Sequence, residues 1–339
     1  MRAHLIIRSA GPGATLQDSG RHGFLRYGVS VAGPMDWIAH ARANILAGNA
    51  ADAGAIEVGL GGIELQAEGG EICLGHAGAP FVLTRIRQRL PAAGRVRLAE
   101  GERLTVKAGA RGAWLYLSPA GGFDLAPVMG SLSTNLRGGI GGLDGRALAA
   151  GDRLALRGSP ALSELGIEER PASRSRPIRV LLGPQDDYFS PEGIARFFAS
   201  SYVLASRSDR MGYRFEGPPI EHAKGFNIVS DGIALGAIQV PGDGKPIVLM
   251  ADRQSTGGYP KLAYVIRADI GRLAQCQPGE SVRFEAVSID VARAELFAAL
   301  REVRASLAAA IPIRGADFSS EFLLSQNLIS GAQNAAEET

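Results

Sequence analysis

Short apolar runs separated by glycine-rich turns dominate this chain. Examples are EICLGHAG, WLYLSPAGG, FNIVSDGIALGAIQV and PIVLMAD. Runs that recur about every ten residues are typical of antiparallel β-structure, and not of a doubly wound parallel sheet. The pattern therefore predicts a mainly β fold with a few helices, built from sandwiches or barrels.

One small motif recurs three times, as EGERLTVKA (100–108), AGDRLALRG (150–158) and PGESVRFEA (278–286). Each copy has a glycine, then an acid, then an alternating apolar–polar strand. The acid is expected in the turn, with one side of the strand in the core. The recurrence favours two similar halves, although chance similarity between such hairpins would also explain it.

Helical spacing of apolar residues is confined to three segments. Residues 34–49 stop at Gly48, and residues 190–198 begin with Ser190 as the expected N-cap and Pro191 in the first turn. Residues 290–310 are expected to open on Asp290. We expect their apolar stripe to pack on its own domain and not to bind a partner; its members are Val291, Leu296, Phe297, Leu300, Val303 and Leu307.

A length of 339 residues favours two domains. The polar segment 159–177, rich in Ser and Arg and bounded by prolines, is the predicted linker. It would separate a first β domain at 1–158 from a second at 178–310, which includes the C-terminal helix. The Ser-, Ala- and Gln-rich residues 311–339 are predicted to form a flexible tail.

Bulk composition excludes several classes of protein. The formal net charge is only +2, which gives no reason to expect nucleic acid or an anionic membrane as a partner. The two cysteines suggest neither a disulfide framework nor a metal site. The apolar stretch at 4–7 is too short for a signal peptide, and no window is long enough to span a bilayer. We therefore predict a cytoplasmic protein.

Common cofactor motifs are also missing from the sequence. GDGKP (242–246) lacks the spacing and the Ser or Thr of a phosphate-binding loop, and no GxSxG motif occurs. The five histidines show no paired metal-ligand spacing, so no metal is expected. None of the four lysines sits in the Met-Lys-Met hairpin that carries biotin. We expect no cofactor to be bound by this chain alone.

Three glycine-containing stretches carry clustered polar side chains. They are residues 13–36, with Gln17, Asp18, Ser19 and Arg21; residues 206–217, with Ser208, Asp209, Arg210 and Arg214; and residues 251–266, preceded by Gln239. Side-chain and backbone donors of this kind can stabilise a developing oxyanion. The set fits the amide, ureido or lactam group of a small polar substrate. Alternatively, each Asp–Arg pair only holds a turn.

At these stretches the sequence resembles the allophanate hydrolase subunit 2 family, also called the biotin-dependent carboxyltransferase family, which includes the C subunit of 5-oxoprolinase. The resemblance runs from about residue 5 to 288, in the family's order. The matching motifs are TLQDSGRHGFLRYGVSVAGPMD, ANILAGN, GSLSTNLRGGIGGLDGRALAAGD, LGPQDDYF, SDRMGYRFEG, SDGIALGAIQVPGDGKPIVLMADRQSTGGYPKLAYVI and QPGESVRF. Gln-Ser-Thr at 254–256 replaces the more usual Gln-Thr-Thr, and the serine keeps the hydroxyl.

The resemblance implies tandem cyclophilin-like β-barrels and three possible roles. The first is a subunit of an ATP-dependent 5-oxoprolinase, which opens the lactam of 5-oxoproline to glutamate. It would act with a sister allophanate hydrolase subunit 1-like protein and a lactam-binding protein like the A subunit of 5-oxoprolinase, which supply ATP handling. The second is a carboxyltransferase half that moves carboxyl from carboxybiotin on a separate carrier to urea or another amide. The third is a non-enzymatic regulator that binds the sister protein.

The resemblance also suggests a ligand-binding edge at the turn 252–261. There Arg253, Gln254, Thr256 and the Gly257 and Gly258 amides would hold the substrate carbonyl. Asp252 would orient the neighbouring arginine or take a proton. The remaining expected site residues are Tyr259 and Lys261, which would close the pocket; Gln239 and Arg210; and Gln17, Asp18 and Arg21, from the first barrel or at the partner interface.

Overall fold

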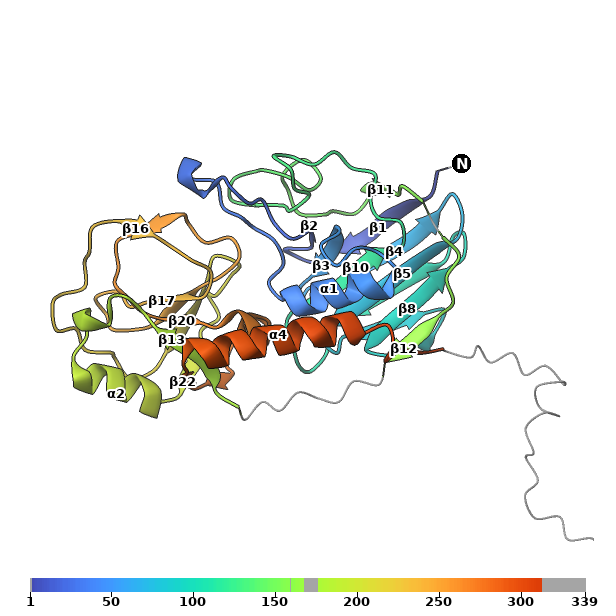
Figure 1. Ribbon diagram of the computed structural model, residues 1–339. Coiled ribbons are helices and arrows are strands. Elements are labelled where there is room, and N and C mark those ends of the chain that lie inside the picture. Colours follow the sequence, from blue (N-terminus) through green and yellow to red (C-terminus); the bar gives the residue numbers. More distant parts are fainter. Residues whose placement is uncertain (1, 159, 168–175, 313–339) are drawn as a thin grey trace, which may run out of the picture.

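Two antiparallel sheets share one apolar core in the first half of the computed structural model, which describes residues 2–158, 160–167 and 176–312 (Figure 1). The first sheet runs, in spatial order, β11 (Arg153–Ala155), β1 (His4–Ala10), β4 (Ile63–Glu68), β9 (Arg103–Lys107), β6 (Val82–Arg85) and β7 (Gln88–Arg89). The second runs β2 (Thr15–Gln17), β3 (Ala55–Val58), β10 (Leu115–Pro119), β5 (Ile72–Gly78), β8 (Ala93–Leu98), β12 (Leu165–Ile167) and β23 (Ile311–Pro312).

The second half contains an eight-stranded sheet that curls into a nearly closed barrel. Its order is β21 (Ser281–Val282), β14 (Tyr202–Leu204), β15 (Gly212–Glu216), β18 (Ile247–Leu249), β17 (Ala237–Gln239), β20 (Lys261–Val265), β13 (Ile178–Leu182) and β22 (Phe284–Ala286). A separate two-stranded ribbon pairs β16 (Asp231–Gly232) with β19 (Thr256–Gly257).

Alternating side chains explain why these segments form sheets. Burial along β4 alternates residue by residue, so one face of this strand packs in the core while the other remains partly open to solvent. Each half has its own core, but Met35 of the first half is fully buried in the core of the second. The predicted mainly β fold with few helices is confirmed.

The recurring glycine–acid motif forms the same turn in all three copies, as predicted. Glu102, Asp152 and Glu280 each accept a hydrogen bond from the backbone N–H three residues earlier, at 2.9, 2.8 and 3.2 Å. The carboxylate therefore closes the turn that precedes the strand, which is the role that acids commonly take in turns.

The helices of the described residues are α1 (Trp37–Leu46), α2 (Pro191–Ala199), α3 (Ile270–Ala274) and α4 (Ile289–Ala305), with 3₁₀ turns η1 (Leu25–Tyr27), η2 (Asp186–Tyr188) and η3 (Arg267–Asp269). The predicted N-cap Ser190 is confirmed, because its side chain accepts the Gly193 N–H. Helix α4 begins earlier than predicted, since Ser288 and not Asp290 lies at its N-cap. The short helix α3 was not predicted.

Helix α4 buries only part of its predicted apolar stripe. Val303 of the stripe is buried, but Phe297 is 55% exposed and Val291 is 42% exposed. Ala292, which lies outside the stripe, is buried as well. The helix contacts both η3 and α1, so α4 packs on both halves and not on its own domain alone (Figure 1).

The predicted linker and tail contain some regular structure. Strand β12 lies inside segment 159–177 and pairs with β8, and β23 lies at the start of segment 311–339 and pairs with β12. The rest of the predicted tail, residues 313–339, and residues 168–175 of the linker lie outside the described residues. Among the helices described, none is long and apolar enough to cross a membrane.

Candidate functional site

A buried ion network joins the two halves around Arg210. Its guanidinium donates to both carboxylate oxygens of Asp252, at 2.9 and 3.0 Å, and to the Gly33 carbonyl at 2.7 Å. It also forms an ion pair with Glu57, from β3 of the first half. Burial favours the neutral guanidine, but the two carboxylates outweigh this effect and raise the pKa of Arg210. The arginine is therefore a fixed cation at the centre of the interface.

Glu57 is held by further donors that sequence reasoning did not find. Its second oxygen accepts the Tyr116 hydroxyl at 2.6 Å and the Met35 N–H at 2.8 Å. Burial, followed by the neighbouring negative charges, raises the pKa of Tyr116 well above its ordinary value, so this phenol is a proton donor at neutral pH. Asp252 has both oxygens on Arg210, which fits the predicted alternative in which the acid orients an arginine, although that arginine is not Arg253.

Arg253 lies beside this network but faces a cleft of about 530 Å³ between the two halves. The cleft is lined by Leu25, Arg26, Gly232, Ile233, Ala234, Leu235, Arg253, Ser255 and Thr256. The arginine is only 6% exposed and donates to the backbone carbonyls of Ile233 at 3.2 Å and Met250 at 3.5 Å. Burial, with a smaller contribution from the nearby charge of Arg267, lowers its pKa to about 10, so it remains charged at neutral pH.

The rest of the predicted turn follows the cleft edge. Thr256 and Gly257 form β19, which pairs with β16, while Gln254 points outward and is exposed. Tyr259 is 40% exposed and is not among the residues that line the cleft. A Cβ at Gly257 would lie 2.7 Å from the Gln239 amide nitrogen, so a larger residue there would displace the end of the Gln239 side chain.

Lys261 lies on β20 and forms a second polar centre. Its side chain is almost completely buried, and its ammonium donates to Asp231 at 3.0 Å. The same hydrogen bond lowers the pKa of Asp231, whose carboxylate is itself largely exposed. Gln185 accepts the Lys261 backbone N–H at 2.9 Å, and Gln239 is buried nearby with its amide 3.4 Å from the Tyr259 carbonyl. This cluster joins the motifs LGPQDDYF and SDGIALG.

Gln17, Asp18 and Arg21 hold a loop of the first half and do not line this cleft. Gln17 donates to the Thr134 carbonyl at 3.0 Å, and Arg21 donates to the Ser133 carbonyl at 2.8 Å. Asp18 accepts from the hydroxyls of Ser131 and Ser133. Burial alone would raise the pKa of Asp18, but these hydrogen bonds outweigh it and lower the pKa. Their predicted role toward a ligand or partner stays a prediction.

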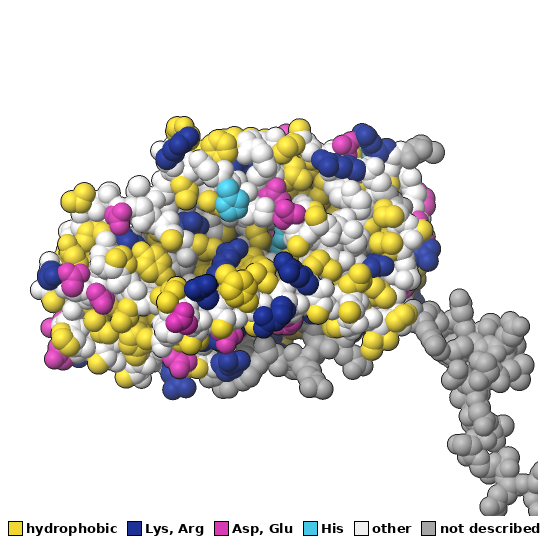
Figure 2. All heavy atoms as spheres, viewed as in Figure 1, with side chains coloured by type: hydrophobic (Ala, Val, Ile, Leu, Met, Phe, Trp, Pro, Cys, Tyr) yellow, Lys and Arg dark blue, Asp and Glu magenta, His cyan; other side chains and the backbone are white. Residues whose placement is uncertain are grey.

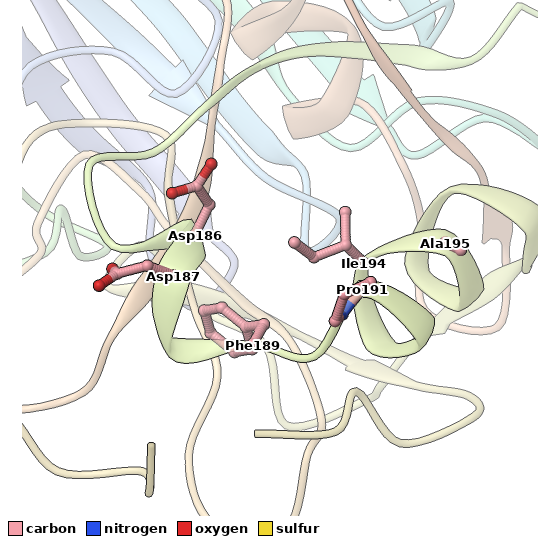
Figure 3. Close-up of a pocket in the computed structure, with 6 residues that line it drawn as sticks. All are labelled: Asp186, Asp187, Phe189, Pro191, Ile194 and Ala195. Carbon is pink, nitrogen blue, oxygen red and sulfur yellow. The ribbon is translucent and has the colours of Figure 1, made fainter. Parts of the chain in front are cut away.

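Another hollow, of about 560 Å³, lies between η2 and α2 (Figure 3). Asp186 and Asp187 stand on the η2 side of it and Ile194 on the α2 side, with Phe189 on the segment between them. Asp187 is already paired with Lys224. The hollow is open to solvent and contains none of the predicted site residues, so we place the candidate site at the cleft between the halves.

Comparisons with known proteins agree with one family. Residues 27–286 match the family model described as the carboxyltransferase domain, subdomain A and B. The chain is 42% identical over 281 residues to the C subunit of 5-oxoprolinase from Haemophilus influenzae, a match that covers 82% of this chain and 90% of that protein. For the corresponding C subunit of Escherichia coli the identity is 41% over 289 residues, covering 85% and 92%.

A solved structure is also similar in fold. The K. lactis urea amidolyase structure gives a TM-score of 0.82 at 28% identity. The match covers 89% of this chain but only 20% of that one, so the chain corresponds to about one fifth of the larger protein.

Proposed function

The chain belongs to the carboxyltransferase-domain family, subdomains A and B, and from this premise we propose that it is a subunit of an ATP-dependent 5-oxoprolinase. In this role it would help to open the lactam of 5-oxoproline to glutamate. It would act with a sister allophanate hydrolase subunit 1-like protein and a lactam-binding protein like the A subunit of 5-oxoprolinase.

The observation that carries this proposal is the extent of the match. The two 5-oxoprolinase relatives, both C subunits, are matched over 90% and 92% of their length, at 42% and 41% identity. In contrast, the chain covers only one fifth of the K. lactis urea amidolyase chain, at 28% identity. The proposal assigns ATP handling to the partner proteins.

The chemistry of the cleft supports the same reading. The guanidinium of Arg253 and the hydroxyls of Ser255 and Thr256 are hydrogen-bond donors on one wall. Such donors stabilise the negative charge that develops on a lactam or ureido oxygen during attack. The described residues that line the cleft include no carboxylate. We therefore expect the base and the phosphoryl donor to come from the partner proteins, and this chain to be inactive alone.

A reconstitution tests the proposal. The chain is co-expressed with the two proposed partner proteins, and glutamate release from 5-oxoproline is measured with and without ATP. Loss of one oxyanion donor typically lowers the rate by about 10²–10³-fold, so Arg253→Ala should reduce turnover by that order. Arg214→Ala is the control, because this arginine is exposed on β15. Absence of ATP-dependent glutamate release from the complete mixture would overturn the proposal.

Carboxyl transfer is the alternative, and the fold similarity to urea amidolyase favours it. The same cleft donors would then hold urea or another amide while carboxybiotin arrives on a separate carrier. Biotin-dependent carboxylation of urea by the chain and its neighbours, without lactam opening, is the result expected from this alternative.

A further inference from the structure

Three arginines with no carboxylate partner among the described residues gather where the two halves meet. Arg26 and Arg253 line the cleft, and Arg267 is near enough for its charge to lower the pKa of Arg253. Arg26 stacks on the Tyr27 ring and Arg267 on the Trp37 ring, with guanidinium carbons 4.8 and 5.2 Å from the ring centroids. On the face seen in Figure 2, Lys and Arg side chains gather in the middle of the molecule.

Arg253 differs from the other buried cations of the described chain. Burying a charge is costly unless it is paired, and several of these cations are paired with acids. Two more, Arg21 and Arg95, donate to backbone carbonyls away from the cleft. Arg253 also relies on carbonyls, but it lines an open cleft together with a second arginine, Arg26. The acid-paired cations are Arg210 with Glu57 and Asp252, Lys261 with Asp231, and the half-buried Arg179 with Asp269.

Neighbouring acids are committed to other groups. Asp252, next to Arg253 in the chain, has both oxygens on Arg210. Asp36, whose charge acts on Arg267, accepts from the first turn of α1 and from the Gln275 amide at 2.9 Å. Among the described residues, therefore, no carboxylate forms an ion pair with Arg253.

We propose that the cleft binds an anionic oxygen group, a carboxylate or a phosphate, held by Arg253 with Arg26 at its rim. Guanidinium groups match the planar oxygens of carboxylate and phosphate in two-point hydrogen bonds. The hydroxyls of Ser255 and Thr256 add neutral donors on the same wall. This site extends the proposed function. Its ligand would be the carboxylate of 5-oxoproline or a phosphoryl group brought by a partner protein, and only the choice of 5-oxoproline rests on the proposed function.

Calorimetric titration of the full-length chain alone tests the site. The probes are 5-oxoproline, its uncharged analogue 2-pyrrolidinone, and inorganic phosphate, each up to the millimolar range. We expect at least one anionic probe to bind, and to bind more weakly as salt is added. Arg253→Gln and Arg26→Gln should each weaken it at least tenfold, whereas the exposed Arg214→Gln should leave it unchanged. Because Arg26 is exposed at the surface, its substitution is not expected to disturb folding.

The two anionic probes distinguish the source of the group. If 5-oxoproline binds and the uncharged 2-pyrrolidinone does not, the ligand group of the site is a carboxylate. If only phosphate binds, the ligand group is a phosphoryl group. Three results would overturn the site: no anionic probe binds, 2-pyrrolidinone binds as tightly as 5-oxoproline, or both arginine variants keep the parent affinity. Anion binding by a chain whose reconstituted mixture opens no lactam would refute only the proposed function.

Discussion

Replacing Arg210 with methionine should weaken the contact between the two halves more than any surface change. The substitution leaves the Glu57 and Asp252 carboxylates buried with no cation, and removes all four bonds that the guanidinium makes. Breaking one side of a buried ion pair costs about 3–5 kcal/mol, because the remaining charge is uncompensated. Arg214→Met, four residues along the chain and exposed, should change the free energy of unfolding by less than about 0.5 kcal/mol.

Tryptophan fluorescence during urea unfolding is a direct assay, because both tryptophans of the chain lie at this interface. Trp37 donates to the Arg267 carbonyl at 2.9 Å, and Trp114 donates to the Tyr213 hydroxyl at 3.1 Å, each across the two halves. We expect the fluorescence transition of Arg210→Met to move to lower urea than that of the parent. If the halves separate before they unfold, the transition measured by circular dichroism should occur at a higher urea concentration than the fluorescence transition.

A second substitution separates charge from packing. If the uncompensated carboxylates cause the loss, then Glu57→Gln in the Arg210→Met background should recover part of it, since one buried charge is removed. A loss below about 1 kcal/mol in Arg210→Met, or no recovery in the double variant, would refute the reasoning, because either result means that the network does not depend on its charges.

Three further outcomes follow from the same contacts. Lys261→Met should abolish turnover of the reconstituted enzyme but change the free energy of unfolding, measured by thermal unfolding, by less than about 1 kcal/mol, because the exposed Asp231 carboxylate is then hydrated by water. A large loss of stability would indicate that Lys261 is a structural residue. Asp18→Asn should lower the free energy of unfolding by about 1.5–3 kcal/mol at pH 7. The difference between the variant and the parent should shrink as the pH falls below 3.8, because hydrogen bonds lower the pKa of Asp18 in the folded state. Burial lowers the pKa of His76 to about 4 from 6.5, so the unfolded chain binds more protons between these values. The free energy of unfolding should therefore fall less steeply between pH 6.5 and pH 4 in His76→Gln than in the parent, by up to about 1.4 kcal/mol per pH unit. An equal slope in the two proteins would show that His76 does not cause the loss of stability.

Local patterns were sufficient for much of the fold. Short apolar runs between glycine-rich turns indicated the β-structure, and the glycine–acid motif identified turns in which Glu102 and its counterparts act as expected. The N-cap at Ser190 followed from two adjacent residues, Ser190 and Pro191. Each of these features depends on neighbours in the sequence, which is why a single sequence is enough to predict them.

Contacts between distant residues could not be predicted in this way. Glu57 reads as one polar position in a short strand, but it is buried because Arg210, 153 residues later, meets it across the interface. Phe297 fits a helical stripe, yet it is exposed, because α4 lies across two halves and buries the side of the helix that carries Ala292 and Val303. For the polar cluster around Lys261, the sequence contains one signal: Gln185 and Asp231 fall in motifs that carry the resemblance to the family.

Asp252 and Arg253 show how one turn can serve both the interface and the cleft. Within this turn, Asp252 enters the buried network while Arg253 lines the cleft. Because both oxygens of Asp252 are bonded to Arg210, Asp252 makes no ion pair with its neighbour, and Arg253 donates to backbone carbonyls instead. The buried network thus has a consequence beyond stability: it keeps the nearest carboxylate away from the cation at the boundary between the halves. Loss of the network should then weaken anion binding as well, since an Asp252 released from Arg210 would be able to pair with Arg253.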